Sequence, residues 1–274
     1  MMNVNAHGAV IPALGFGVFR MSEAEVETLI PAALETGFRH FDTAQIYENE
    51  AALGRALTAA GARRDDLFLT TKVWVSNYSA DRFAASVDES LDRLGVDHVD
   101  LLLAHWPGDA VPVERQIEWL NEVQAAGKTR HIGVSNYNRS QLKAAIAASA
   151  TPIITNQIEM HPYLDQSAMI ALAADTGTAL TAYYGMADGA VPRDAVLAEI
   201  GAGHGKTAAQ VALRWLVQQG IIALSKTANP ARLAENFAIF DFALSGAEMA
   251  RITALSRADG RLVSPAGLAP DWAA

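Results

Sequence analysis

The sequence contains no cysteine, which excludes disulfide bonds, thiolate metal sites and cysteine nucleophiles. It has no run of eighteen apolar residues, so we expect no membrane-spanning helix. The first residues, MMNVNAHG, lack the basic start and the apolar core of an export signal. Together with the absent cysteine, this start predicts a protein of the reducing cytoplasm.

Basic residues are also scarce, with 21 Lys and Arg against 30 Asp and Glu, which gives a formal net charge of −9. Such a chain is a poor partner for nucleic acid, because phosphate binding needs a basic surface. A local basic pocket for one phosphorylated cofactor is still compatible with this charge. We therefore expect a small-molecule partner, with no nucleic acid and no membrane, and a monomeric protein.

The chain has no Pro-, Gly- or Ser-rich linker, and residues 1–274 are therefore interpreted as one domain. Short apolar runs alternate with amphipathic segments along its length. The apolar runs predict eight strands, at residues 13–16, 40–41, 67–72, 99–104, 129–134, 154–158, 179–183 and 221–224. A helical pattern follows each strand. The first helix begins at the capping box Ser22-Glu-Ala-Glu25, and a final helix covers 246–256 before a short C-terminal loop.

Alternating strands and helices imply an α/β fold with a parallel sheet. Eight such units in 274 residues favour closure into a (β/α)8 TIM barrel, with the last helix as an accessory element. The alternative is a doubly wound open sheet, which normally carries G-x-G-x-x-G after its first strand. Gly15-Phe-Gly17 lacks the third glycine, and a tight turn explains this pair equally well.

Polar residues recur where consecutive predicted strands end. Asp42 follows the second strand and Lys72 ends the third. His105 directly follows the fourth strand, Tyr47 lies in the loop after Asp42, and Ser135-Asn136 follows the fifth. The carboxyl ends of parallel strands meet at one end of a barrel, where barrel active sites lie. We therefore expect these side chains to converge in space.

The chemistry of the first four residues suits proton donation. A free tyrosine has a pKa of about 10 and is a poor proton donor near neutrality. An ammonium about 4 Å away stabilises tyrosinate by roughly 4 kcal/mol at an effective dielectric constant of ~20. Lowering the pKa of Tyr47 by two units needs only about 2.7 kcal/mol. Lys72 is therefore expected to suffice, with Asp42 as its counter-ion.

A neutral His105 beside the tyrosine can donate a hydrogen bond to a carbonyl oxygen and orient it. The set suits protonation of the oxygen of a carbonyl that receives a hydride. Because none of these side chains is a hydride source, a cofactor must supply one. Each residue alone also has a structural explanation, as an ion pair, a packed tyrosine or a satisfied core histidine. The joint arrangement at adjacent strand ends favours a catalytic site.

These residues lie within longer motifs that resemble one family. The motifs are Gly37-Phe-Arg-His-Phe-Asp-Thr-Ala-Gln-Ile-Tyr-Glu-Asn-Glu50, Leu101-Leu-Leu-Ala-His-Trp-Pro107, Gly127-Lys-Thr-Arg-His-Ile-Gly-Val-Ser-Asn136 and Asn156-Gln-Ile-Glu159. Over essentially the whole chain, the sequence resembles the aldo-keto reductases. The C-terminal segment from Asp259 to Trp272, DGRLVSPAGLAPDW, is most similar to the bacterial 2,5-diketo-D-gluconate reductases of the B type.

The resemblance implies an NADPH-dependent reductase and assigns roles to the four polar residues. According to this resemblance, Tyr47 is the general acid, Lys72 and Asp42 adjust the pKa of Tyr47, and His105 orients the substrate carbonyl. The resemblance also implies contacts to the cofactor. The nicotinamide carboxamide is held by Ser135, Asn136 and Gln157, and the ring stacks on Tyr183. The adenosine 2′-phosphate is held by Lys226, Thr227 and Arg232, and the adenine by Glu235 and Asn236. The substrate pocket is walled by Trp74, Trp106 and Trp272.

The function expected from this resemblance is reduction of aldehydes and ketones to alcohols. The candidate substrates are small dicarbonyls such as methylglyoxal, aromatic aldehydes and 2,5-diketo-D-gluconate. Two other classes stay open. One is a catalytically silent barrel that senses nucleotide. The other is a metal-dependent barrel hydrolase built on Asp42, His105 and His161, although no clustered His-x-His pattern appears and no metal is expected.

Overall fold

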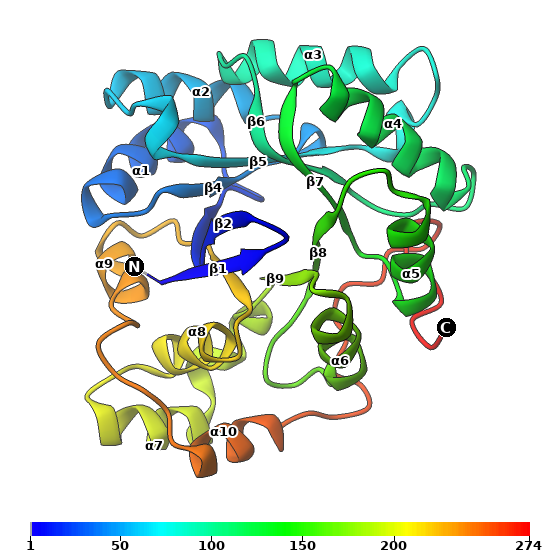
Figure 1. Ribbon diagram of the computed structural model, residues 1–274. Helices are drawn as coiled ribbons and strands as arrows, with labels where there is room; N and C mark the ends of the chain where they lie inside the picture. The colour runs from blue at the N-terminus through cyan, green and yellow to red at the C-terminus, as the bar shows by residue number, and fades with distance from the viewer. Residues whose placement is uncertain (1) are drawn as a thin grey trace.

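The computed structural model describes residues 2–274, which form a closed barrel of eight parallel strands (Figure 1). The strands follow one another around the barrel in chain order, and the last pairs with the first. They are β3 (Leu14–Gly17), β4 (His40–Asp42), β5 (Phe68–Val73), β6 (Val99–Ala104), β7 (Thr129–Ser135), β8 (Ile153–Glu159), β9 (Ala179–Tyr183) and β10 (Ile222–Ser225). The predicted (β/α)8 barrel is confirmed, and the open-sheet alternative is wrong because β10 pairs with β3.

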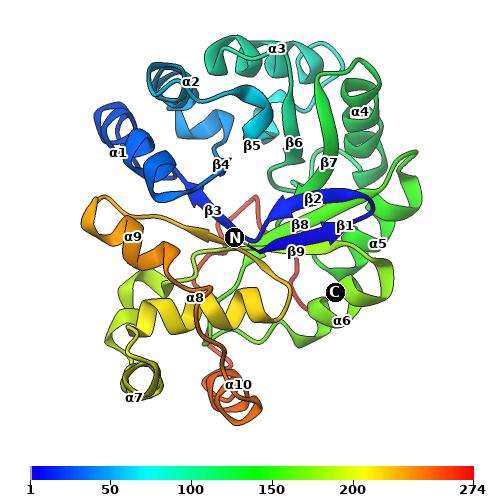
Figure 2. The same cartoon turned by 60° about the vertical axis from the view of Figure 1, so that its left-hand side comes forward.

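Helices surround the barrel on the outside (Figure 2). They are α1 (Glu23–Thr36), α2 (Glu50–Ala59), α3 (Phe83–Leu94), α4 (Val113–Ala125), α5 (Arg139–Ala148), α6 (Ser167–Thr176), α7 (Ala195–His204), α8 (Ala208–Gln218), α9 (Ala231–Phe237) and α10 (Gly246–Thr253). The predicted capping box at Ser22 and Glu25 begins α1. Within residues 2–274, no helix combines the length and apolar content that a bilayer crossing requires.

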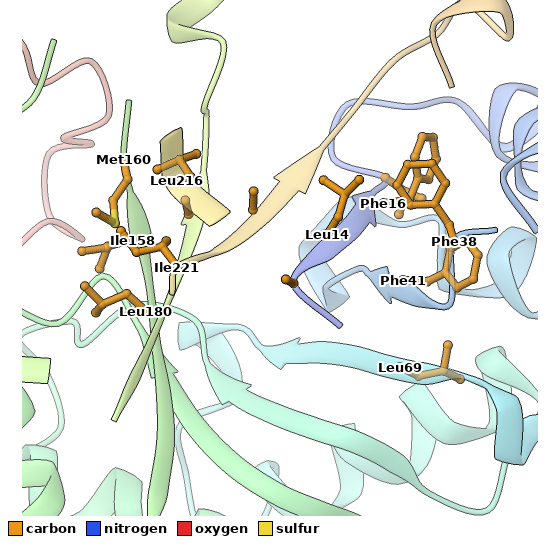
Figure 3. Close-up of a cluster of buried hydrophobic side chains, with 14 of the residues drawn as sticks. Leu14, Phe16, Phe38, Phe41, Leu69, Ile158, Met160, Leu180, Leu216 and Ile221 are labelled. Atoms are coloured by element: carbon orange, nitrogen blue, oxygen red, sulfur yellow. The ribbon is translucent and has the colours of Figure 1, made fainter. Parts of the chain in front are cut away.

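The strands are buried on both faces because the helices cover the outside and side chains fill the inside. Every residue of β5 and β6 is buried. Figure 3 shows part of the outer core, where Phe16 and Phe38 meet edge to face with ring centroids 5.7 Å apart. Gly133 lets β7 approach its neighbours, because a Cβ there would lie 2.7 Å from the Thr155 carbonyl oxygen.

An antiparallel hairpin closes the amino-terminal end of the barrel. It consists of β1 (Asn3–Ala6) and β2 (Ala9–Pro12), joined by a two-residue turn at His7 and Gly8. Both turn residues have positive φ, 48° and 88°, as a tight hairpin of this kind requires. The hairpin lies across the barrel in Figure 1 and buries Ile11 against the inner strand side chains. The opposite, carboxyl-terminal end of the barrel is left free for a site.

The chain after α10 has no regular secondary structure and returns to the carboxyl-terminal end of the barrel. We call residues 257–274 the C-terminal strap. In Figure 1 the strap (red) lies behind the barrel, whereas the hairpin (blue) lies in front. The strap therefore lies at the barrel end where the polar strand termini meet.

Candidate active site

The structure brings Asp42, Lys72 and Tyr47 into direct contact at the carboxyl-terminal end of the barrel. The Lys72 ammonium is fully buried and donates hydrogen bonds to Asp42 Oδ1 at 2.6 Å and to the Thr43 carbonyl oxygen at 2.7 Å. Its Nζ also lies 3.3 Å from Tyr47 Oη. The phenol oxygen is thus held beside a cation whose other partners are fixed.

A short 3₁₀ turn, η1 (Gln45–Tyr47), places the tyrosine. The Gln45 amide nitrogen donates to Ser86 Oγ at 3.0 Å, and its oxygen accepts from the Trp74 backbone N–H at 2.8 Å. These bonds tie the turn to α3 and to the end of β5. The position of Tyr47 is therefore set by two neighbouring units of the barrel.

The phenol of Tyr47 is held in its protonated form. Burial raises the pKa of Tyr47 well above its ordinary value, and the negative charge of Asp42 raises it further. The net pKa of Tyr47 is therefore raised in this structure, because burial and Asp42 act against the lowering expected from Lys72. The physical reason is that burial disfavours the charged phenolate, and the negative charge of Asp42 disfavours it further. A protonated phenol is the form that a general acid requires.

Lys72 still acts on the phenol through its short contact. Burial lowers the pKa of Lys72, and the charge of Asp42 opposes that shift. The ammonium nitrogen is closer to the phenol oxygen than a water-separated ion would be. When the phenol gives up its proton, the Lys72 N–H can donate to the new phenolate. The pair therefore stabilises the product of proton transfer more than the starting phenol.

His105 lies beside Tyr47 at the carboxyl-terminal end of the barrel, and its ring packs against two aromatic side chains. Its ring centroid is 5.7 Å from that of Tyr47 and 5.1 Å from that of Trp74, both edge to face. Burial, and then the charge of Lys72, lower the pKa of His105 well below its ordinary value. The imidazole is therefore neutral at physiological pH and can donate one hydrogen bond to a carbonyl oxygen.

The depressed pKa of His105 predicts a loss of stability in acid. In the unfolded chain this histidine titrates near pH 6.5, so below that pH the unfolded chain binds a proton that the folded protein does not. We expect the free energy of unfolding to fall between pH 7 and 5, by up to about 1.4 kcal/mol per pH unit from this group. His105→Gln should reduce that slope in urea unfolding at pH 5, 6 and 7. An identical slope in the wild type, His105→Gln and the exposed-site control His7→Asn would contradict this account.

A cavity of about 710 Å³ opens above these residues. Tyr47, Trp74, His105, Trp106 and Lys226 are among its lining residues. The others come from the end of β3 and the loop after it, the end of β4, η1, the ends of β7 to β10, the loop after β9 and the C-terminal strap. This volume is typical of sites for cofactors and small substrates.

The three predicted carboxamide contacts share one hydrogen-bonded patch at this end of the barrel. Ser135 Oγ donates to the Gln157 carbonyl oxygen at 2.8 Å, and Asn136 Nδ2 donates to the His105 carbonyl oxygen at 3.0 Å. Tyr183 Oη donates to Asn136 Oδ1 at 2.6 Å. These three side chains and that of Tyr183 line the cavity. Asn136 has a φ of 64°, a left-handed conformation that asparagine tolerates.

Gln157 connects this patch to the catalytic carboxylate. Its Nε2 donates to Asp42 Oδ2 at 2.8 Å, while Asp42 Oδ1 accepts from Lys72. The strand order brings residues 115 positions apart into this contact. The sequence did not predict this contact between Gln157 and Asp42, because it forms only when the barrel closes.

The residues present fit a dinucleotide. Polar groups line the end of the cavity near β7 and β8, and Ser225 Oγ is buried without a hydrogen-bond partner among residues 2–274. Lys226, which follows β10, also lines the cavity. A cavity lined by amide and hydroxyl groups together with a cation suits a nicotinamide nucleotide with a phosphate.

The segment after β10 places the predicted adenosine contacts on and before α9. Thr227 Oγ1 accepts from the Asn229 backbone N–H at 3.0 Å, which shapes the turn. Arg232 is exposed on α9, Glu235 accepts from the Thr207 hydroxyl at 2.8 Å, and Asn236 is buried. Of this group only Lys226 lines the cavity. Thr227 lies before α9, and the other three lie on it.

Two of the three predicted tryptophan walls line the cavity, Trp74 and Trp106. The third, Trp272, does not line it. Its indole lies over the Arg261 guanidinium at 3.7 Å and packs edge to face behind Trp106, with ring centroids 6.5 Å apart. Its Nε1 donates to Ser264 Oγ at 3.1 Å.

The sequence interpretation missed apolar residues that complete the wall. They are Phe19, Met186, Leu262, Val263 and Leu268. Phe19 packs on Tyr47 with ring centroids 4.9 Å apart. The sequence signal for Phe19 was its place two residues after Gly17, just past the end of the first strand.

The third residue of the metal-hydrolase alternative, His161, lies outside this cluster. His161 Nε2 pairs with Glu159 Oε1 at 3.0 Å. In the part of the chain that the structure describes, no three His, Asp or Glu side chains are grouped as metal ligands. The site's polar groups are instead arranged around a phenol and an ammonium.

A closed (β/α)8 barrel with this Tyr–Lys–Asp group, a neutral histidine and a cavity of cofactor size above them defines a class of barrel oxidoreductases that reduce carbonyl groups. Comparison with known proteins agrees: the aldo/keto reductase family model matches residues 13–257. The chain belongs to the aldo/keto reductase family. Members of this family use NADPH, and the chain is accordingly an NADP-dependent oxidoreductase that reduces carbonyl groups.

Named relatives cover nearly the whole chain. Methylglyoxal reductase DkgB of Salmonella typhimurium is 43% identical over 265 residues, covering 96% of this chain and 99% of the relative. Morphine 6-dehydrogenase of Pseudomonas putida is 39% identical over 270 residues, covering 93% and 90%. A crystal structure of a protein proposed to be a 2,5-diketo-D-gluconic acid reductase B is 61% identical, with a TM-score of 0.98, covering 99% of this chain and 98% of that one.

Proposed function

We propose that Tyr47 donates the proton in carbonyl reduction, with Lys72 and Asp42 as its supporting pair. The observation that carries this proposal is the 3.3 Å contact between Lys72 Nζ and Tyr47 Oη at the floor of the cavity. Bound NADPH supplies the hydride. The neutral His105 holds the carbonyl oxygen, and Tyr47 protonates that oxygen as negative charge develops on it.

The cofactor contacts form the second part of the proposal. Ser135, Asn136 and Gln157 hold the nicotinamide carboxamide, and Tyr183 stacks on the ring. The shared hydrogen-bond patch supports this assignment, because its amide and hydroxyl groups lie beside the catalytic floor. Binding the carboxamide there would orient the ring relative to the carbonyl that His105 holds.

The 2′-phosphate of the cofactor is proposed to lie against Lys226, Thr227 and Arg232, with the adenine against Glu235 and Asn236. Lys226 lines the cavity, which supports this placement of the phosphate. Arg232→Ala should raise KM for NADPH by roughly tenfold and leave KM for NADH nearly unchanged, because it removes a charge-assisted contact to phosphate. Steady-state kinetics with both cofactors measures this.

The control for that experiment is Arg251→Ala, which removes an exposed arginine of α10 that pairs with Glu199. It should leave both KM values unchanged. Equal losses with NADPH and NADH in the Arg232 variant would show that Arg232 does not contact the 2′-phosphate.

The substrates are proposed to be small dicarbonyls such as methylglyoxal, aromatic aldehydes and 2,5-diketo-D-gluconate. The apolar walls at Trp74 and Trp106 suit compact or aromatic carbonyls, and the names of the relatives point the same way. NADPH oxidation followed with each carbonyl tests the proposal. Binding of NADPH without oxidation by any of them would favour the nucleotide-sensing alternative.

We also propose that residues 1–274 act as one domain and as a monomer in the cytoplasm, without a nucleic-acid partner. The formal charge of −9 argues against a nucleic-acid partner, and the lack of cysteine supports a cytoplasmic location. Light scattering should give a mass near the 29.2 kDa of one chain.

A further inference from the structure

A buried carboxylate outside the catalytic group holds the C-terminal strap. Glu159 ends β8 and its side chain is fully buried. Its Oε1 accepts from the Leu262 backbone N–H at 2.7 Å and from His161 Nε2 at 3.0 Å. Its Oε2 accepts from the Val263 backbone N–H at 3.0 Å, and Arg261 Nη1 lies 3.6 Å away.

This contact set suits a carboxylate and no other side chain of similar size. An ionised carboxylate only accepts hydrogen bonds, and three N–H groups lie within hydrogen-bond distance of Glu159. The Arg261 guanidinium forms an ion pair with it at 3.6 Å. A glutamine there would direct its amide N–H₂ at one of the two backbone N–H groups and leave that group unsatisfied.

The loop after β8 supports the same stretch of the strap. The Arg257 backbone N–H donates to the Tyr163 carbonyl oxygen at 3.1 Å. At Gly260 an added Cβ would lie 1.9 Å from that carbonyl oxygen, so only glycine fits. The strap is therefore fitted closely onto the barrel just before Glu159 holds its backbone.

A second attachment fixes the far end of the strap. Asn138 Nδ2 donates to the Asp271 carbonyl oxygen at 2.8 Å, and Trp272 covers Arg261. Between the two attachments the strap contributes five residues to the cavity wall. They are Leu262, Val263, Ser264, Pro265 and Leu268.

We propose that Glu159 is a positioning residue that sets the substrate-side wall by holding the backbone of Leu262 and Val263. The inference rests on the proposed function, because it concerns the carbonyl that enters the same cavity. Glu159 touches no member of the catalytic group. Its strand partner in β9 is Tyr183, the proposed ring contact, but the Tyr183 hydroxyl donates to Asn136 and the Glu159 carboxylate accepts from the strap backbone. Its loss should therefore weaken binding of carbonyls large enough to reach the strap, and should spare small carbonyls and NADPH.

The test uses Glu159→Gln in the full chain, with 4-nitrobenzaldehyde as a large carbonyl and methylglyoxal as a small one. We expect KM for 4-nitrobenzaldehyde to rise about tenfold, because a charge-assisted acceptor of backbone N–H is lost. KM for methylglyoxal, kcat and Kd for NADPH should change by less than about threefold. The matched control is Glu122→Gln, an exposed carboxyl on α4, which should match the wild type.

Leu262→Pro provides a second variant that leaves the buried carboxylate in place. It removes the backbone N–H of residue 262, which donates to Glu159. The Leu262 side chain is half exposed, so the substitution should leave the barrel core unchanged. We expect the same selective rise in KM. The double variant should show little further loss, because both changes remove the same contact. Additive losses, or equal losses for both carbonyls, would overturn the proposal.

Trypsin gives a readout that does not depend on activity. Arg261 is covered by Trp272 and lies near Glu159, so cleavage after it requires the strap to leave the barrel. Glu159→Gln should release residues 262–274 about tenfold faster than Glu122→Gln does. Equal release rates would contradict the role of Glu159. Rapid release in a protein whose wild type reduces neither carbonyl would support the attachment and contradict the proposed function.

Discussion

Replacing Tyr47 with phenylalanine should lower kcat for carbonyl reduction by about 10²–10⁴-fold, the contribution of a well-placed general acid. Kd for NADPH should stay within about twofold of the wild-type value, because the phenol hydroxyl is not among the proposed cofactor contacts. The physical reason is that burial and Asp42 keep the phenol protonated, and Lys72 can stabilise the phenolate that remains after transfer. Initial rates with methylglyoxal and a fluorescence titration with NADPH measure the two effects.

Tyr163→Phe is the matched control, since it removes a phenol hydroxyl that donates to Asp194 away from the catalytic floor. Its kcat should equal that of the wild type. Unchanged turnover in the Tyr47 variant would show that the proton comes from another group.

Lys72→Met should lower both stability and activity. It leaves the Asp42 carboxylate, only 3% exposed, without its charged partner. Removing one partner of a buried ion pair typically costs about 3–5 kcal/mol in the free energy of unfolding. kcat should fall by about 10²-fold or more, because the phenolate loses its N–H donor. Urea unfolding and initial rates on the same preparation measure the two losses.

The double variant Asp42→Asn/Lys72→Met separates these effects. Neutralising the carboxylate removes the unpaired buried charge, so most of the lost stability should return. Activity should not return, because no ammonium then faces Tyr47. Recovery of kcat together with stability would mean that Lys72 supports the fold alone. Wild-type stability in the single variant would contradict the buried ion pair.

Local patterns were enough to predict the barrel and the place of its site. Each strand is an apolar run, and the capping box at Ser22 marks the start of α1 in the sequence itself. Asp42 and Lys72 follow or end such runs, so parallel pairing alone brings them to one end of the barrel. These inferences needed only periodicity and the rule that parallel strands align their ends.

Other features depend on contacts that no local pattern records. The β1–β2 hairpin was not predicted. Helical patterns were expected after the strands at 154–158 and 179–183, but without the bounds of α6 and α7, and α6 is preceded by Gln166, which makes no side-chain cap to its backbone. The position of Trp272 depends on where the strap lies, and the strap is fixed by Glu159 and Asn138. The pKa of Tyr47 depends on burial, which pairwise reasoning about one ammonium left out.

The most direct test of the account is the single-turnover rate of NADPH oxidation by wild-type protein with saturating methylglyoxal, compared in H₂O and D₂O at matched acidity. If the phenol of Tyr47 protonates the oxygen as the hydride arrives, the rate should be lower in D₂O, because that proton exchanges with solvent. The same rate in both solvents would contradict proton donation in the step that reduces the carbonyl.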